Sequence, residues 1–229
     1  GLTHFLPRAD AEVAVVYAGA ARGDHLVFLA DLFPGATFHL YDPNPFDARL
    51  SEAPDRFRVH NGLFTDEIAQ GWGGGRCGVF ISDIRSVTRD MSGGEAAFEA
   101  RVRADMEAQT AWARLIAPRL GCILKFRPPY VDPEKEARPE QDTFECLRGR
   151  AMWQAWPPKL PTEGRLIVEA ADAAPGAPPM QLDARLYQDV CFHHNTIARP
   201  WGSFAWGRHQ APSALGPPPP RCAGWSLGT

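Results

Sequence analysis

Lysine is scarce in this sequence. Of its 229 residues 24 are basic, but only three are lysines, at positions 125, 135 and 159. Because arginine supplies most of the positive charge, a lysine inside an apolar segment indicates that its amine is needed. Lys125 lies in such a segment, GCILKFRP at 121–128, which predicts a buried strand. Lys125 is therefore a candidate catalytic residue.

Long hydrophobic runs are absent as well. The sequence has no run of about eighteen apolar residues, and its first residues, GLTHFLPRADAE, lack the basic-then-apolar order of a signal peptide. We therefore expect a soluble, cytoplasmic protein with no membrane partner. Its first residue is glycine, as expected of a processed product or of an excerpt from a longer protein. The 45% apolar content is enough for one well-buried domain.

Paired metal-ligand motifs are also missing. The five cysteines are odd in number and form no C-x-x-C pair, which argues against a disulfide framework and a zinc site. We expect buried thiols and no metal. The histidines at 25, 193 and 194 have no cysteine or acid at ligand spacing. The net charge is −3, so nucleic-acid binding would need a local basic patch.

The N-terminal region lacks the G-x-G-x-x-G spacing of a nicotinamide-cofactor site. Val13–Ala18 predicts a strand, Gly19–Gly23 a turn and Asp24–Phe33 a helix. Glycines in such a turn let backbone N–H groups approach a ligand beside the helix N-terminus, although close packing explains them equally well. The next strand, Ala36–Tyr41, ends at Asp42, which fits either ribose binding or a plain turn.

Another strand ends in a carboxylate. Gly78–Ser86 reads GVFISDIRS, an apolar run that breaks at Asp83. The carboxyl ends of parallel strands form the ligand-binding edge of an open α/β sheet. We therefore expect Asp83 and Lys125 to face each other in one active site.

The remaining segments complete an α/β pattern. We expect a strand at 56–60 followed by Asn61, a helix at 66–70 capped by Thr65, and a polar loop at 87–94. A helix with a solvated charged face follows at 95–116, and two further strands at 149–156 and 164–170. The chain then continues with a linker at 171–179, a helix at 182–199 and an extended tail at 200–229. The tail contains PPPP and three tryptophans, which indicates that it lies on a surface of this domain or of a partner.

Seven segments, taken together, resemble one protein family. They are VVYAGAARGDHL, HLYDPN, FISDIRS, LKFRPPYVD, GRAMWQAWPP, PTEGRL and YQDVCFHHNTIAR, in this order between Val15 and Arg199. The chain resembles the poxvirus-type cap-specific mRNA 2′-O-methyltransferase, which in poxviruses doubles as the small regulatory subunit of poly(A) polymerase. The resemblance implies a doubly wound, mostly parallel seven-stranded α/β sheet of the S-adenosylmethionine-dependent methyltransferase type over residues 1–199, followed by the tail at 200–229.

The resemblance also implies ligands, partners and a location. The cofactor would be S-adenosyl-L-methionine and the substrate capped RNA. A poly(A) polymerase, capping or polymerase complex would dock through the tail. The location would be cytoplasmic, in a viral factory or virion if the source is a virus.

Three members of the family's Lys-Asp-Lys-Glu tetrad fall on Asp83, Lys125 and Glu163. The implied cofactor contacts are Tyr17, Gly19, Gly23, His25, Asp42, Asn61, Asp83 and Ile84. The implied substrate contacts are Arg85, Tyr130, Asp132 and Gln188. Tyr130 and Asp132 would hold the methylated guanine of the cap. Gln188 stands where the family has another acid that contacts the cap. The first lysine of the tetrad and the second aromatic of the cap site precede the part of the family that this sequence matches, and Arg22 replaces a proline.

The chemistry sets a condition on the base. A lysine can deprotonate a ribose 2′-hydroxyl only when neutral, so an ordinary pKa of about 10.4 must fall by roughly three units, or about 4 kcal/mol. Burial and nearby cations lower the pKa of an amine, whereas carboxylates raise it. We therefore expect Asp83 and Glu163 to orient Lys125.

From the residues alone, two plainer interpretations stay open. A salt bridge at the sheet edge accounts for Lys125 and Glu163 as well as catalysis does. Tyr130 and Asp132 could be ordinary loop residues, although a cationic methylated guanine requires an aromatic face and a carboxylate.

Three functions follow. The first is an active methyltransferase on capped RNA, which Asp83, Lys125 and Glu163 favour. The second is a catalytically retired methyltransferase domain that acts as a structural or RNA-binding subunit, which the unmatched first lysine and the negative net charge favour. The third is methylation of uncapped ribosomal or transfer RNA by the same chemistry. We expect the first.

Overall fold

The computed structural model describes residues 2–6, 12–86, 94–128, 130–131, 142–153 and 163–198. Among the expected site residues, Asp132 lies outside these ranges. Most of the expected polar loop at 87–94 and the tail at 200–229 also lie outside them. The domain boundary at residue 199 therefore stays a prediction.

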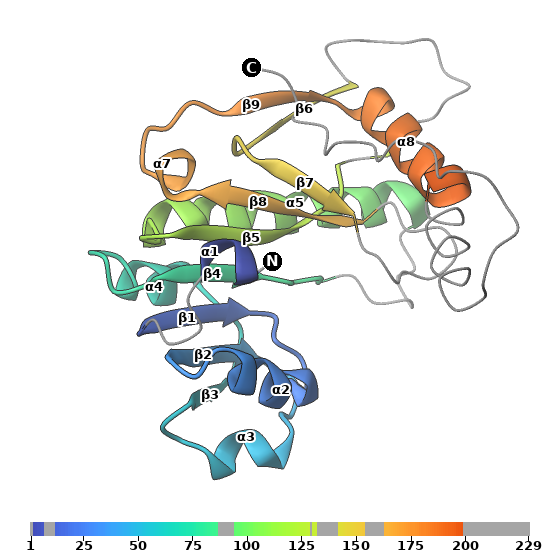
Figure 1. The fold of residues 1–229 in the computed structure, drawn as a ribbon. Coiled ribbons are helices and arrows are strands. Elements are labelled where there is room, and N and C mark those ends of the chain that lie inside the picture. Colours follow the sequence, from blue (N-terminus) through green and yellow to red (C-terminus); the bar gives the residue numbers. More distant parts are fainter. Residues whose placement is uncertain are drawn as a thin grey trace, which may run out of the picture.

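Seven strands form one sheet in the order β3-β2-β1-β4-β5-β8-β7 (Figure 1). Their bounds are β1 Val13–Ala18, β2 Ala36–Asp42, β3 Phe57–Asn61, β4 Val79–Ser82, β5 Gly121–Phe126, β7 Arg150–Trp153 and β8 Gly164–Glu169. The first five strands in this order run parallel, whereas β8 is antiparallel to both its neighbours. The strand order reverses between β1 and β4, as in doubly wound sheets. The expected doubly wound, mostly parallel seven-stranded sheet is confirmed.

Helices cover both faces of the sheet (Figure 1). One face carries α1 (Leu2–Phe5), α2 (Asp24–Leu32) and α3 (Ala48–Glu52), and the other carries α4 (Asp66–Gly71), α5 (Gly94–Ile116) and α8 (Ala184–His193). The short α7 (Ala170–Ala173) follows β8, and a π-helix, η1 (His194–Ala198), extends α8.

Alternation along the strands sorts the core into two clusters. In β1, Val16 and Ala18 pack in the cluster shared with α4, α5 and α8, whereas Val15 and Tyr17 pack in the cluster shared with α1, α2 and α3. All four residues are at most 9% exposed. A strand that is buried on both faces needs an unbroken apolar run, which explains the sequence VAVVYA.

Most expected elements are confirmed, including the Thr65 cap, whose side chain accepts a hydrogen bond from the backbone N–H of Ile68. The expected linker is wrong in part, because Ala170–Ala173 forms α7. The expected last helix begins too early, because Met180–Asp183 forms strand β9. β9 pairs antiparallel with β6 (Thr143–Cys146) in a separate two-stranded sheet. Four-residue strands carry little periodicity, so their pairing could not be predicted.

The expected solvated charged face of the 95–116 helix is also wrong in part. Asp105 is buried, and its carboxylate accepts a hydrogen bond from the backbone N–H of Ser86. Ionised groups can be buried only when such partners are present.

Three further observations concern expected sites. Four of the five cysteines, at 77, 122, 146 and 191, are described; all four are buried, and none of them is in a disulfide. The described residues contain no group of three or more side chains arranged to hold a metal ion. No helix in the described part of the chain has the length and hydropathy that crossing a membrane requires.

Candidate active site

Three strand ends meet at one edge of the sheet. Because β4 and β5 are parallel, Asp83, just after β4, lies at the same edge as Lys125 near the end of β5. β8 runs the other way, so its beginning lies at this edge, and Arg165 is the register partner of Lys125. Glu163 directly precedes β8. The antiparallel strand therefore brings a second carboxylate to the lysine.

The side chains project from one face. Asp83, Lys125 and Arg165 each lie two residues from an isoleucine of β4, β5 or β8 and so point to the same side of the sheet as that isoleucine. The isoleucines are Ile81, Ile123 and Ile167, which all belong to the core cluster shared with α2. The acid and the two cations thus extend one face of the sheet beyond its core.

Lys125, Asp83, Arg165 and Glu163 form a closed ring of alternating charge. The Lys125 Nζ lies 2.9 Å from Asp83 Oδ1 and 3.3 Å from Glu163 Oε1. The Arg165 Nη2 donates to Asp83 Oδ2 at 2.9 Å, and its Nη1 lies 3.8 Å from Glu163 Oε1. The lysine side chain is 15% exposed and both acids are 25% exposed. The side chains of the ring are thus partly buried, and each keeps some exposed surface.

The structure thus brings Asp83, Lys125 and Glu163 together, and their catalytic roles stay a prediction. Arg165 was missed by the sequence analysis. Its signal was its position two residues after Glu163, on a strand beside that of Lys125. Like charges directly opposite each other destabilise a sheet, so the two acids between these cations are needed to hold them together.

A third cation, Arg85, contacts the far side of Glu163. Its Nη2 donates a short hydrogen bond to Glu163 Oε2, and its Nη1 lies 3.8 Å from Asp105 Oδ2. Burial favours a raised pKa for Glu163, but the charges of Lys125 and Arg85 outweigh it and hold that pKa below its ordinary value. Glu163 is therefore an anion at neutral pH. A phosphate that approached Arg85 would compete with this carboxylate.

The turn after β1 packs directly on the chain at Asp83. Gly19 has a φ of +75°, and a Cβ atom there would lie 2.8 Å from both the Asp83 carbonyl carbon and the Ile84 nitrogen. The Gly19 N–H donates to the Tyr41 carbonyl at 2.8 Å. The ends of β1, β2 and β4 are thereby fixed together at the point where the strand order reverses. Open α/β sheets bind ligands at this point.

Asp42 holds the same turn from the end of β2. Its Oδ2 accepts from the Ala21 N–H, and its Oδ1 accepts from the backbone N–H and the side-chain amide of Asn44, each at 2.8 Å. Asp42 is 6% exposed. The structure therefore gives Asp42 a turn-stabilising role, and its contact with a ribose stays a prediction.

The other cofactor candidates surround this turn. Tyr17 ends up buried beside Asp83, and burial, followed by the charge of Asp83, raises the pKa of its hydroxyl far above the ordinary value. Its hydroxyl therefore stays a neutral donor. The remaining candidates, Gly23, His25, Asn61 and Ile84, lie at the start of α2, at the end of β3 and directly after Asp83.

The substrate candidates lie beyond β5. Tyr130 is 46% exposed, and its backbone N–H donates to Glu99 of α5 at 3.1 Å. The Gln188 side chain accepts from the Val131 N–H and donates to the Val131 carbonyl. The Tyr130 ring is therefore free to stack on a planar ligand, whereas the amide of Gln188 is already engaged with backbone.

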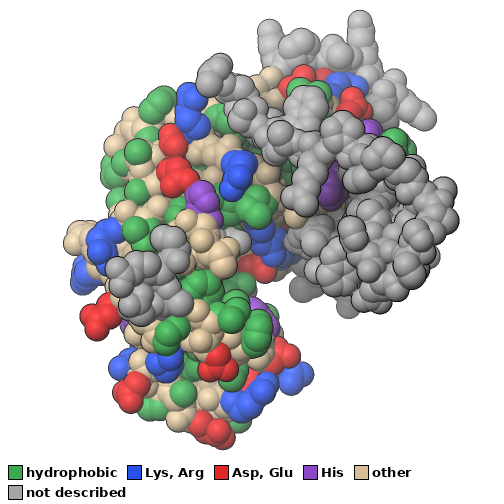
Figure 2. Space-filling model, in the orientation of Figure 1, with side chains coloured by type: hydrophobic (Ala, Val, Ile, Leu, Met, Phe, Trp, Pro, Cys, Tyr) green, Lys and Arg blue, Asp and Glu red, His purple; other side chains and the backbone are tan. Residues whose placement is uncertain are grey.

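Basic side chains are dispersed over the visible face of the molecule (Figure 2). Blue and red groups alternate there, and the described part of this face shows no large basic patch. Near the site, the cations Lys125, Arg165, Arg85 and Arg127 each contact an acid. Any RNA bound here would have to compete for these cations.

Comparison with known proteins assigns no family. No protein-family model matches the sequence, and no curated protein sequence matches it significantly. Solved structures with similar folds include WbdD, at 21% identity over 74% of this chain and 37% of that one, with a TM-score of 0.38. A probable spermidine synthase from Corynebacterium glutamicum is 10% identical over 83% of this chain and 74% of that one, with a TM-score of 0.42.

Human methyltransferase-like protein 13 in complex with SAH is 18% identical over 52% of this chain and 57% of that one, with a TM-score of 0.30. Of WbdD, the first structure named above, this chain spans little more than a third of the length. Similarities at this level assign no activity. The strand order alone identifies the fold as Rossmann-like.

Proposed function

We propose that this protein is an S-adenosylmethionine-dependent methyltransferase that methylates the ribose 2′-oxygen of the first transcribed nucleotide of capped RNA. The observation that carries the proposal is the placement of the Lys125 amine between Asp83 and Glu163, at 2.9 and 3.3 Å, beside the glycine turn. The resemblance in motif order supports the capped-RNA substrate. Lys125, Asp83 and Glu163 stand where that resemblance implies three members of the tetrad.

The cofactor region fits this proposal. Gly19 allows the backbone after β1 to approach Asp83 closely, and Asp42 lies at the neighbouring strand end. A glycine turn and a strand-end acid are what an adenosine-bearing ligand meets in doubly wound folds. S-adenosylmethionine, when bound, would supply the methyl group as an electrophile.

The residues of the ring would divide the remaining work. Lys125 would take the proton from the 2′-hydroxyl as the oxygen is methylated. Asp83 and Glu163 would hold the amine in place, since each contacts it from a separate strand end. Arg165 and Arg85 would balance the two carboxylates and keep them from moving toward the solvent.

A second candidate function is a retired methyltransferase domain that serves as a structural or RNA-binding subunit. The observation that favours it is that Lys125 and Arg165 of the ring, and the neighbouring Arg85, are each already paired with an acid of this chain and so need no substrate to balance their charge. Docking of such a subunit through the tail at 200–229 belongs to this proposal. Methylation of uncapped RNA is the third candidate.

A calorimetric titration combined with a transfer assay would test the proposal. We expect S-adenosylmethionine to bind and methyl groups to appear on capped RNA, with less on the same RNA lacking the cap. Binding without transfer to either RNA would support the retired domain instead. Equal transfer to both RNAs would remove cap recognition from the proposal.

The Tyr130→Ala variant should lose preference for capped RNA. Stacking of a base on an aromatic ring contributes about 1–3 kcal/mol, so we expect the preference to fall roughly tenfold or more. Comparing kcat/KM for capped and uncapped RNA measures this. Phe28→Ala, which removes another exposed aromatic ring from α2, is the matched control, since Phe28 is 65% exposed. An unchanged preference in Tyr130→Ala would contradict the assignment.

A further inference from the structure

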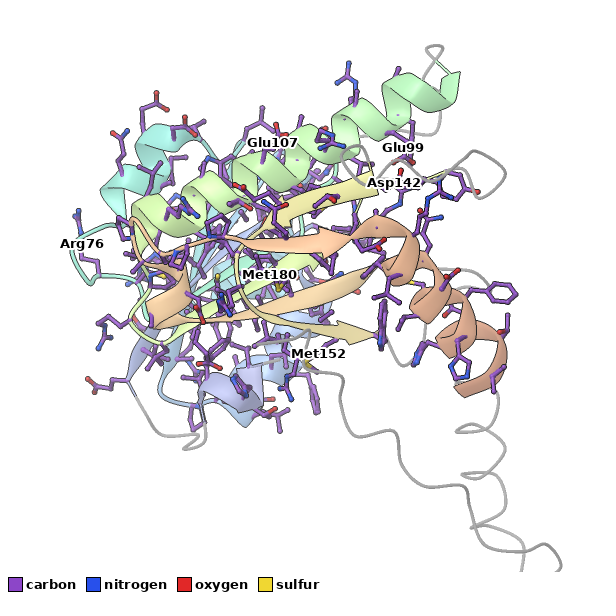
Figure 3. The ribbon with its side chains drawn as sticks, turned by 90° about the horizontal axis from the view of Figure 1, so that it is seen from above. Arg76, Glu99, Glu107, Asp142, Met152 and Met180 are labelled. Atoms are coloured by element: carbon purple, nitrogen blue, oxygen red, sulfur yellow. The ribbon has the colours of Figure 1, made fainter. Side chains whose placement is uncertain are left out.

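Helix α5 directs three polar side chains toward the sheet edge. Asp105 is 7% exposed, Gln109 is 2% exposed, and the Glu99 side chain is 20% exposed. Figure 3 shows Glu99 on the N-terminal half of α5, directed toward the strands. A buried polar side chain costs stability unless its hydrogen bonds are made, so each of these residues needs a partner.

Two of these partners belong to the strand ends of the ring. The Gln109 side-chain amide donates a short hydrogen bond to the backbone carbonyl of Lys125. The Asp105 Oδ2 accepts from the Ser86 N–H at 2.9 Å and lies 3.8 Å from Arg85 Nη1. Arg85 in turn holds Glu163. Both contacts come from the α5 face of the sheet, opposite the face from which Lys125 projects.

The third partner is the segment that presents Tyr130. Glu99 accepts two hydrogen bonds from Arg127, at 2.9 and 2.6 Å, and one from the Tyr130 N–H at 3.1 Å. Arg127 also lies over the ring of Phe98, with its guanidinium carbon 5.2 Å from the ring centre. A two-pronged arginine–carboxylate pair fixes orientation as well as distance. The backbone at Tyr130 is therefore held from α5.

We infer that Glu99, Asp105 and Gln109 are positioning residues, which fix the segments at Asp83, Lys125 and Tyr130 relative to one another through one continuous helix. The inference rests on the proposed function and deepens it. At 1.5 Å per residue the ten steps from Glu99 to Gln109 span about 15 Å, so one rigid helix can fix the position of Lys125 relative to the Tyr130 ring. Misplacement by about 1 Å can cost a hundredfold in rate.

The positioning residues should affect different stages of the reaction, turnover or substrate binding. Asp105 reaches Lys125 through Arg85 and Glu163, so its loss should affect turnover. The hydrogen bonds that Glu99 makes in the described part of the chain go to Arg127 and to the backbone of Tyr130, so its loss should mainly affect substrate binding. A helix that merely stabilised the fold would give both variants the same defect.

The experiment compares Glu99→Gln and Asp105→Asn with Glu107→Gln as the control. Glu107 lies exposed on the same helix (Figure 3). We expect Glu99→Gln to raise KM for capped RNA about tenfold with kcat little changed, because the Tyr130 segment loosens. We expect Asp105→Asn to lower kcat by about 10- to 100-fold, with a shifted pH–rate profile and an unchanged KM. Glu107→Gln should match the wild type.

Amide hydrogen exchange gives a readout that does not need activity. Glu99→Gln should speed exchange at the Tyr130 N–H, which donates to Glu99, and Asp105→Asn at the Ser86 N–H, whereas the Val131 N–H, held by Gln188, should exchange as in the wild type. If the wild type methylates no RNA but these exchange changes occur, the proposed function fails, and what stands is that Glu99 and Asp105 hold the segments at Tyr130 and Ser86. Wild-type kinetics and exchange in both variants, or equal defects in both and in Glu107→Gln, would overturn the inference.

A folding defect would not leave the question open. If Asp105→Asn does not fold, Arg85→Gln breaks the same link from Asp105 to Glu163 and should lower kcat in the same way. An unchanged kcat in Arg85→Gln would overturn the role given to Asp105. The Glu99→Gln measurement is independent of both.

Discussion

Methyl transfer by the Lys125→Arg variant should fall by about 10²- to 10⁴-fold, although arginine keeps the positive charge. An arginine side chain stays protonated under all working conditions and cannot accept the ribose proton. It can still pair with Asp83 and Glu163, which contact the lysine at 2.9 and 3.3 Å. Single-turnover assays with capped RNA and labelled S-adenosylmethionine measure the loss.

This substitution separates a base from a salt bridge. If Lys125 only stabilises the sheet edge, Lys125→Arg should be as active as the wild type and Lys125→Met should be less stable. If Lys125 is the base, both variants should be inactive while the cofactor still binds, since Arg165 and Arg85 remain to offset the two acids. Activity retained in Lys125→Arg would remove the assignment.

Replacing Gly19 with alanine should destabilise the protein by about 2–5 kcal/mol and abolish tight cofactor binding. Alanine at a φ of +75° costs roughly 1–2 kcal/mol, and a contact at 2.8 Å with two backbone atoms adds about 1–3 kcal/mol more. The neighbouring atoms belong to Asp83 and Ile84, so the clash must move the chain that carries the acid. Urea unfolding and calorimetric titration of S-adenosylmethionine measure the two effects.

Gly74→Ala is the matched control for this prediction. Gly74 has a φ of +71°, close to that of Gly19, but a Cβ atom there has no neighbour within 4 Å. The control therefore carries the same backbone strain without the clash, and we expect it to cost about 1–2 kcal/mol and to leave cofactor binding intact. Equal losses in Gly19→Ala and Gly74→Ala would show that close packing against Asp83 is unimportant.

The strands were the most predictable part of the fold. Strands buried on both faces require continuous apolar runs, so VAVVYA and VFIS carried a clear signal. Helix α5 was predicted from its apolar spacing, but the burial of Asp105 was not. A carboxylate in a helix resembles a solvated residue until the Ser86 N–H that binds it is known. The β6–β9 pair was missed because each strand has only four residues.

The candidate site was predictable only as separate parts. Asp83 and Lys125 could be placed at strand ends, because parallel strands share a ligand-binding edge. Arg165 could not be identified, because its role depends on β8 running antiparallel beside β5. Glu99 acts on Tyr130 across 31 positions of sequence, and no local pattern encodes that contact.

The sequence by itself determined which segments are buried and which of them end in a charged group, because burial on two faces imposes an apolar run and an acid or amine interrupts it visibly. Only the tertiary structure decided which charges meet. Ion pairing depends on separations of a few ångströms between charged atoms. These separations follow from strand order, strand direction and the position of α5 on the sheet, and no local segment of sequence determines them.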